Sequence, residues 1–118
     1  MANLSNTSTA NQVAFGQLGS VYATAAGAEI LPPVGRVFVA ITMLEDCTFD
    51  ATGGLVAEDA DRWANTDDAA HSIATPDQDE GHGGLEIPST QAFPKGMTIY
   101  GRWKEVDLAT GTCIAYIG

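Results

Sequence analysis

The stretch RVFVAITML, residues 36–44, constrains the fold of this chain more than any other, because it is apolar on both faces of an extended backbone. Its β-branched and aromatic side chains favour a β-strand. One face would carry Val37, Val39, Ile41 and Met43, and the other face would carry Phe38, Ala40, Thr42 and Leu44. A strand that is covered on one side only alternates apolar with polar residues. We therefore predict a strand covered on both sides, by an opposite sheet and by a loop or another subunit.

Shorter extended segments surround this strand and indicate an all-β fold. Extended runs separated by glycine occur in residues 13–25, and residues 45–57 have the pattern of a strand, a turn around DATGG and a second strand. The chain has 118 residues, which suits one domain, and its 13 glycines and 5 prolines favour short strands and turns over helices. We predict a small antiparallel β-sandwich or barrel, formed as a single domain by residues 13–118.

Two strand-like runs, joined by a short turn, make up the last part of the sequence, MTIYGRWKEVDLATGTCIAYIG. Ile99 and Trp103 share one face of the first run, but Val106 falls on the opposite phase. A β-bulge near Glu105 would return Val106 to the apolar face, and we predict one there. Gly111 suits the left-handed position of the turn. We therefore predict a C-terminal hairpin in which the last strand pairs with the strand before it.

The net charge of −10, from 15 acidic and 5 basic residues, is distributed unevenly. Twelve carboxylates and a single arginine lie between residues 45 and 86. Most of these carboxylates belong to residues 58–84, a long polar and acidic loop of the length that is usually functional or partly disordered. Binding to nucleic acid or to an anionic membrane depends largely on clustered positive charge. We therefore predict no nucleic-acid partner and no membrane partner.

Residues 1–12 are small and polar, with Leu4 as the one large aliphatic side chain, and we predict a flexible N-terminal arm. The arm is either a disordered tail or a segment that becomes ordered on a neighbouring protein. It has neither the basic nor the apolar region of a signal peptide, and no stretch of the sequence is long enough to span a bilayer. We therefore expect synthesis in the cytoplasm.

The sequence has no catalytic signature: it contains no phosphate-binding loop, no dinucleotide fingerprint and no nucleophile elbow. We predict that the protein is not an enzyme and has no catalytic residues and no cofactor. A metal site would have to use His71, Asp77, Asp79 and His82. Their spacing matches no standard zinc pattern, so we favour solvated carboxylates and predict no metal.

The two cysteines, Cys47 and Cys113, lie in apolar, strand-like contexts. Two cysteines are too few for a disulfide scaffold, and free cysteine is among the most often buried residue types. We predict buried free thiols, with a bridge between neighbouring strands as the alternative.

Alternate residues near the end of the chain share one face of a predicted strand: Thr98, Tyr100, Arg102 and Lys104. This face is either an ordinary solvated strand face or a docking face, since tyrosine and arginine are enriched at interface hot spots. A basic face on an acidic protein would orient it on a negatively charged surface.

The segments RVFVAITMLEDCTFDATGGLVA and FPKGMTIYGRWKEVDLATGTCIAYIG resemble the small virion proteins of tailed bacteriophages, especially marine and cyanobacterial phages. The chain is most similar to their head decoration, or cement, proteins. This resemblance implies a non-enzymatic role in which many copies bind the major capsid protein on the capsid exterior and stabilise the shell. It also implies localisation in the virion after synthesis in the host cytoplasm, and self-association as a trimer or dimer.

Under this hypothesis, the interface with the capsid or with another subunit would include Leu4, Phe38, Leu44, Tyr100, Arg102 and Lys104. One alternative is a tail-associated or receptor-binding virion protein, in which the acidic loop recognises a receptor. A further alternative is a small β module that binds a sugar or another small ligand in an aromatic-lined pocket. Trp63 and Trp103 are the candidates for such a pocket, although both suit the core better.

Overall fold

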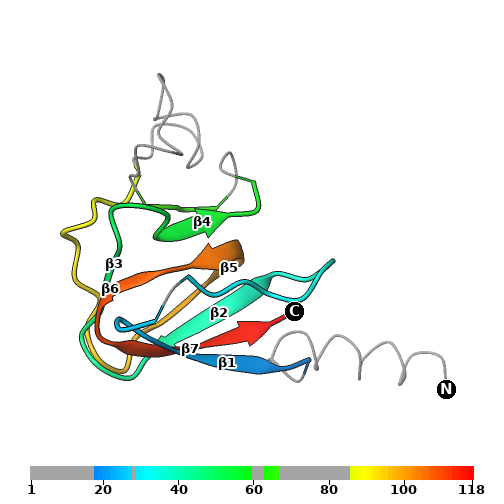
Figure 1. Ribbon diagram of the computed structural model, residues 1–118, viewed down its shortest axis with the longest axis horizontal. Coiled ribbons are helices and arrows are strands. Elements are labelled where there is room, and N and C mark those ends of the chain that lie inside the picture. Colours follow the sequence, from blue (N-terminus) through cyan, green and yellow to red (C-terminus); the bar gives the residue numbers. More distant parts are fainter. Residues whose placement is uncertain (1–17, 28, 60–62, 67–85) are drawn as a thin grey trace, which may run out of the picture.

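The computed structural model describes residues 18–27, 29–59, 63–66 and 86–118, which form seven β-strands and no helix (Figure 1). The strands are β1 (Ser20–Thr24), β2 (Phe38–Met43), β3 (Thr48–Phe49), β4 (Leu55–Ala57), β5 (Thr98–Val106), β6 (Leu108–Thr110) and β7 (Thr112–Ile117). The prediction of an all-β fold is confirmed. Within these residues no helix is long and apolar enough to cross a membrane. The predicted arm and most of the acidic loop lie outside the described residues.

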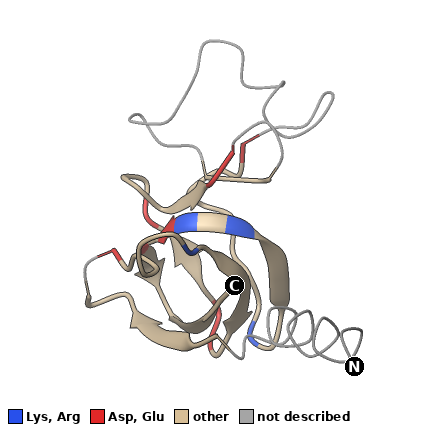
Figure 2. Cartoon of the chain, turned by 90° about the vertical axis from the view of Figure 1, so that its right-hand side faces the viewer, with Lys and Arg blue, Asp and Glu red and all other residues tan. Residues whose placement is uncertain are grey.

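All strand pairs in the two sheets are antiparallel. The main sheet has five strands in the order β1-β7-β2-β5-β4, and β3 pairs with β6 in a separate two-stranded sheet. The main sheet is twisted and curls around the core (Figure 2). The chain that leaves β1 crosses to β5, where Ile30 and Val106 exchange backbone hydrogen bonds of 2.8 and 3.0 Å. The finer choice between a sandwich and a barrel stays a prediction.

The predicted C-terminal hairpin is wrong. β7 pairs with β1 on one side and with β2 on the other, so that β2 separates β7 from β5. The corner between β6 and β7 is Gly111, whose φ of +88° confirms the predicted left-handed conformation. A Cβ added to Gly111 would collide with the carbonyl oxygen of Asp46 and would lie 2.7 Å from Cys47 Sγ. The chain passes this close to Cys47 because it turns there into β7, alongside β2, instead of folding back on β5.

A bulge in β2 changes which of its side chains face the core. The register shifts between Phe38 and Ala40 against both neighbouring strands. Phe38 therefore joins Ile41 and Met43 in the core, whereas Ala40 and Thr42 lie on the opposite face. The predicted alternation is wrong for Phe38, because a strand keeps its period of two residues only as far as a bulge.

The bulge predicted near Glu105 is confirmed. In the ladder between β4 and β5 the register shifts between Trp103 and Glu105, which leaves Lys104 as the extra residue. The shift places both Trp103 and Val106 on the buried side. The indole Nε1 of Trp103 donates a hydrogen bond of 2.8 Å to the carbonyl oxygen of Ala64, which satisfies the polar atom of this buried ring.

The core lies against the inner face of the main sheet. Its largest fully buried side chains include Phe38, Phe49, Ile41, Met43, Leu55 and Val106. Phe49 packs edge-on against Phe93, with the ring centroids 5.2 Å apart. Full burial of one such side chain stabilises the fold by roughly 1.5–3 kcal/mol. The inner face of the main sheet is thus covered by the core, and of its two faces only the other can contact a partner.

Candidate docking face

Side chains on the side of the main sheet turned away from the core line up in two rows, which the register of the ladders determines. One row is Ser20, Tyr116, Ala40 and Tyr100, across β1, β7, β2 and β5. The second row, across the same strands, is Tyr22, Ile114, Thr42 and Thr98. We call these eight residues the outer face. All three tyrosines of the chain belong to it.

Two of these tyrosines are the most exposed aromatic side chains of the outer face. Tyr22 is 61% exposed and Tyr100 is 74% exposed, whereas Tyr116 is half-buried. Ala40 lies between Tyr116 and Tyr100 in its row and is only 6% exposed. Because the Ala40 side chain is short, a flat partner surface would contact the tyrosine rings on either side of it.

Two threonine side chains lie beside each other on β2 and β5 of the outer face. Thr42 Oγ1 and Thr98 Oγ1 are 2.9 Å apart and share a hydrogen bond between β2 and β5. Both strands are paired on two sides in the main sheet. Side chains on paired strands are positioned more rigidly than side chains on loops, so the outer face would lose little conformational entropy on binding.

The outer face is uncharged over most of its width. β1, β2 and β7 contain no charged residue. Charged side chains enter along β5, where Arg102 and Lys104 form two blue segments in Figure 2. A partner that covers hydroxyls and aromatic rings has less desolvation to overcome than one that covers carboxylates. On a protein with a net charge of −10, this sheet face offers a partner a surface with little charge to desolvate.

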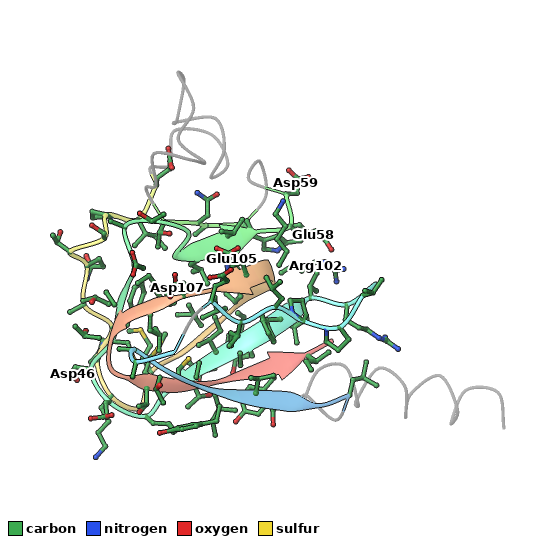
Figure 3. The ribbon with its side chains drawn as sticks, in the orientation of Figure 1. Asp46, Glu58, Asp59, Arg102, Glu105 and Asp107 are labelled. Atoms are coloured by element: carbon green, nitrogen blue, oxygen red, sulfur yellow. The ribbon has the colours of Figure 1, made fainter. Side chains whose placement is uncertain are left out.

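Arg102, a predicted docking residue, is engaged within its own chain. Its guanidinium donates to both carboxylate oxygens of Glu58, at 2.9 and 3.1 Å, and lies 5.8 Å from the centre of the Trp63 ring. The two side chains lie together beside β4 in Figure 3. The bond between them lowers the pKa of Glu58 and raises the pKa of Arg102. Because Glu58 neutralises its charge in a bidentate pair, Arg102 is poorly placed to recognise a negatively charged partner.

The other predicted interface residues lie in different surroundings. Tyr100 belongs to the outer face, and Lys104 is exposed on the same strand. Leu44 directly follows β2 and is 36% exposed. Phe38 is completely buried in the core of its own chain, so its ring is removed from the candidate interface. Leu4 lies outside the described residues.

Sequence reasoning missed Tyr22 and Tyr116 as members of this face. In both SVYAT and TCIAYI, tyrosine falls on one phase of the alternation and small or aliphatic core residues fall on the other. That signal was available in the sequence. The tyrosines form one surface because the register places Tyr116 and Tyr100 on either side of Ala40. The predicted hairpin between β5 and β7 would not have placed Ala40 between them.

A second group of side chains gathers where β5 leads into β6. A Cβ added to Gly53 would lie 2.5 Å from Glu105 Oε2 and 3.7 Å from Asp107 Oδ2, so the two carboxylates approach the same point. Burial raises the pKa of Asp107, and the nearby charges of Asp50 and Glu29 raise it further. Figure 3 shows Glu105 and Asp107 on the side of the Arg102–Glu58 pair that is nearer to β6. No group of three or more His, Cys, Asp or Glu side chains is arranged to hold a metal ion in the described part of the chain.

The two thiols are free and buried, as predicted. Burial raises the pKa of Cys47, and it raises the pKa of Cys113 to about 12. Thiols with raised pKa values are poor nucleophiles at neutral pH, because the thiolate is the reactive form. The alternative metal site, in residues 71–82, lies outside the described residues.

The outer face is therefore the candidate site that the geometry supports best. It combines exposed tyrosines, an uncharged surface over three strands and a backbone that is paired within one sheet. Comparison with known protein families, with curated proteins and with solved structures finds no match to this chain.

Proposed function

We propose that this chain is a non-enzymatic binding protein that docks on another protein through the outer face. The observation that supports this proposal is the gathering of all three tyrosines on an uncharged sheet face of a protein with a net charge of −10. Tyrosine offers a large apolar ring, a hydroxyl and few rotatable bonds, and it is enriched at interface hot spots. A stable interface buries about 800 Å² on each partner, so the contact would extend beyond the eight residues to Leu44 and Lys104 at their border.

The partner in this proposal is the major capsid protein of a tailed bacteriophage, bound from the capsid exterior. This step rests on the resemblance of the sequence to head decoration proteins, and the charge distribution is compatible with it. Many copies of an acidic protein on one shell would repel each other and any further particle, which would keep the particles soluble. The protein would stabilise the shell by bridging neighbouring coat subunits, alone or as a dimer or trimer.

The copy number in the virion is the first test of this proposal. Quantitative mass spectrometry of purified virions gives the molar ratio of this chain to the major capsid protein. For a symmetric shell component we expect a ratio between about one to three and one to one. A ratio near about one to a hundred would instead indicate a tail-associated or receptor-binding protein, which occupies few positions of the particle. Absence from the virion would refute the structural role, and a screen of small ligands would then test the β-module alternative.

The second test asks whether the outer face is the surface that binds. Tyr100→Glu places a charge on the most exposed tyrosine of the face and should weaken binding to capsids at least about tenfold. Thr90→Glu is the matched control, because Thr90 is exposed in a turn outside the outer face and gains the same charge. Equal occupancy of the shell by both variants would show that the outer face does not dock. Lys104→Glu should have a smaller effect that shrinks with added salt.

A further inference from the structure

The edge of the main sheet at β1 pairs on one side only. Among the residues that the structure describes, β1 has a ladder with β7 and no other strand. The hydrogen bonds at the two ends of this ladder show its phase. Ala25 N–H donates to Gly111 O at 3.1 Å, and Ile117 N–H donates to Gly19 O at 2.8 Å. The odd-numbered residues from 19 to 25 therefore direct their backbone groups to β7.

The even-numbered residues of β1 direct their backbone groups to the open edge, because the two directions alternate along an antiparallel strand. Ser20 and Tyr22 each present an N–H and a C=O there, and Thr24 presents its N–H. The C=O of Thr24 is used locally, since it accepts a hydrogen bond of 3.2 Å from Gly27 N–H. Tyr22 is the middle residue of this row of donors and acceptors.

β1 lacks three features that often prevent a sheet edge from pairing. Natural edge strands are commonly blocked by a charged side chain, a proline or a bulge. The sequence of β1, SVYAT, contains no charge and no proline, and its register with β7 runs without a shift. An edge of this kind is a template for an additional strand.

The sequence of β1 is also complementary to itself. An antiparallel partner strand with the same sequence, centred on Tyr22, would place Ser20 opposite Thr24 and Val21 opposite Ala23. Each small hydroxyl residue would then meet another, each aliphatic residue would meet another, and the two copies of Tyr22 would face each other. Such cross-strand pairs of like character stabilise antiparallel sheets, and tyrosine pairs add aromatic contact.

We infer that β1 pairs antiparallel with β1 of a second copy of this chain, with Tyr22 at the two-fold axis. In this arrangement Tyr22 forms a hydrogen-bonded pair with its own counterpart, which exchanges two backbone bonds, and Thr24 N–H of each copy donates to Ser20 C=O of the other. The 61% exposed ring of Tyr22 then packs against the same ring of the second copy. The contact is isologous and closes as a dimer.

The order of side chains along β1 favours a second copy over a foreign strand at this edge, and the lack of charge on β1 permits it. Two copies that each carry a net charge of −10 repel wherever their carboxylates approach. β1 and its neighbour β7 have no charged residue, so the two copies meet without opposed carboxylates. A foreign partner would find no charged group on these strands to recognise, whereas the self-complementary order of side chains specifies the chain itself.

The dimer would join the two main sheets into one continuous sheet. A two-fold axis perpendicular to the sheet keeps both outer faces on the same side, so the dimer offers twice the tyrosine surface of one copy. This inference goes beyond the proposed function and does not depend on it. Sedimentation of the purified chain tests dimerisation without any capsid, so failure of one proposal does not affect the other.

The first experiment compares Tyr22→Glu with Tyr100→Glu in the full chain by analytical ultracentrifugation. Both substitutions put a carboxylate on an exposed tyrosine of the outer face, but β7 and β2 separate Tyr100 from the edge. The native chain should show a monomer–dimer equilibrium, and Tyr22→Glu should weaken it at least about tenfold by opposing two carboxylates at the axis. Tyr100→Glu should leave it unchanged. A native chain that stays monomeric up to about 0.5 mM, forms trimers, or responds equally to both variants would overturn the inference.

The second experiment tests the register and does not depend on the stability of Tyr22→Glu. A Tyr22→Cys variant places two cysteines opposite each other, within the Cα separation of about 4.4–6.8 Å that a disulfide needs, and mild oxidation should give a covalent dimer. Thr24→Cys is the matched control, since its two copies would be roughly 13 Å apart along the strands and should not be linked. The native cysteines are buried and do not compete. Equal cross-linking of both variants, or of neither, would contradict the pairing.

Discussion

The two edge strands of the main sheet, β4 and β1, differ in whether other described residues hydrogen-bond to their outward backbone groups. At the β4 edge, Thr66 N–H donates to Leu55 O, and Leu55 N–H donates to Thr66 Oγ1, each at 2.9 Å. Every residue of β4 is buried, and so is Thr66. At the β1 edge, Ser20 and Tyr22 are exposed, and none of the described residues forms a strand on the side of β1 away from β7.

This difference shows that the open edge is not forced by the small size of the protein. Closing the β4 edge requires a buried hydroxyl on Thr66 and a segment that returns to the sheet, where Thr66 forms a bridge with Ile87. Within the described residues, the chain therefore covers the β4 edge with a returning segment. At the β1 edge the described residues provide no such cover, which agrees with the pairing of β1 inferred above.

The largest effect on stability should come from removing β7, the strand that pairs with β1. Deleting residues 114–118 removes most of β7, which is the described partner of β1 and a neighbour of β2. We expect the cooperative thermal transition, followed by circular dichroism, to disappear. Deleting Gly118 alone is the control and should keep the transition, because β7 ends at Ile117. A melting curve unchanged by the longer deletion would contradict this account of the sheet.

The next largest effect on stability should come from removing the Thr66 hydroxyl, which covers the β4 edge. Thr66→Ala leaves the buried N–H of Leu55 without its acceptor, and an unsatisfied buried donor costs about 1–3 kcal/mol. Denaturant unfolding should show this loss in the free energy of unfolding. Thr66→Ser keeps the hydroxyl and should recover most of the loss. Equal destabilisation by both variants would mean that packing of the threonine methyl group, and not the edge hydrogen bond, stabilises this side.

A smaller effect, an increase in stability, is expected from replacing Asp107. The N–H of Asp107 donates to the Gly54 carbonyl just before β4. Its pKa is raised in the folded protein, chiefly by burial, so the ionised carboxylate disfavours the native state. The penalty is present above the folded pKa and disappears as the pH falls below the unfolded value of about 3.9. Asp107→Asn should therefore raise the melting temperature at pH 7 and leave it nearly unchanged at pH 3. A decrease at pH 7 would contradict the prediction.

The smallest effect is expected for the ion pair that follows β4. Arg102 lowers the pKa of Glu58, so the pair stabilises the fold above the unfolded pKa of about 4.3, and this contribution is lost as the pH falls through the folded pKa. Glu58→Gln should lower the melting temperature slightly at pH 7, less in high salt, and not at pH 2. A decrease that persists at pH 2 would indicate that the loss does not come from the charge of Glu58.

Local patterns in the sequence predicted much of the fold. The apolar run around Ile41, the bulge before Val106 and the left-handed Gly111 each depend on a few neighbouring residues, and the structure confirms them. The partner of β7 was predicted wrongly, because two runs joined by a short turn resemble a hairpin whatever the rest of the sheet does. Pairing between strands far apart in sequence leaves no comparable local pattern.

The candidate site could be predicted only in part. Tyr100 was identified from its strand alone, whereas Tyr22 and Tyr116 required the order β1-β7-β2-β5. Phe38 was placed on the wrong face because the shift before Ala40 arises from contacts with two neighbouring strands and has no glycine or proline to signal it. A surface that several strands build together depends on register, and register is a property of the whole sheet.

The position of β7 between β1 and β2 has a consequence for the order in which the protein folds. The ladders join Ser20 to Tyr116 and Phe38 to Ile117, so the chain must close very long loops before these strands pair. Folds dominated by such distant pairings typically take about milliseconds to seconds to form. Among the described strands β1 pairs with β7 alone, so we expect it to join the sheet after β7 has paired with β2. Association through β1 would then be available only to molecules that have completed folding, and assembly would select against incompletely folded copies.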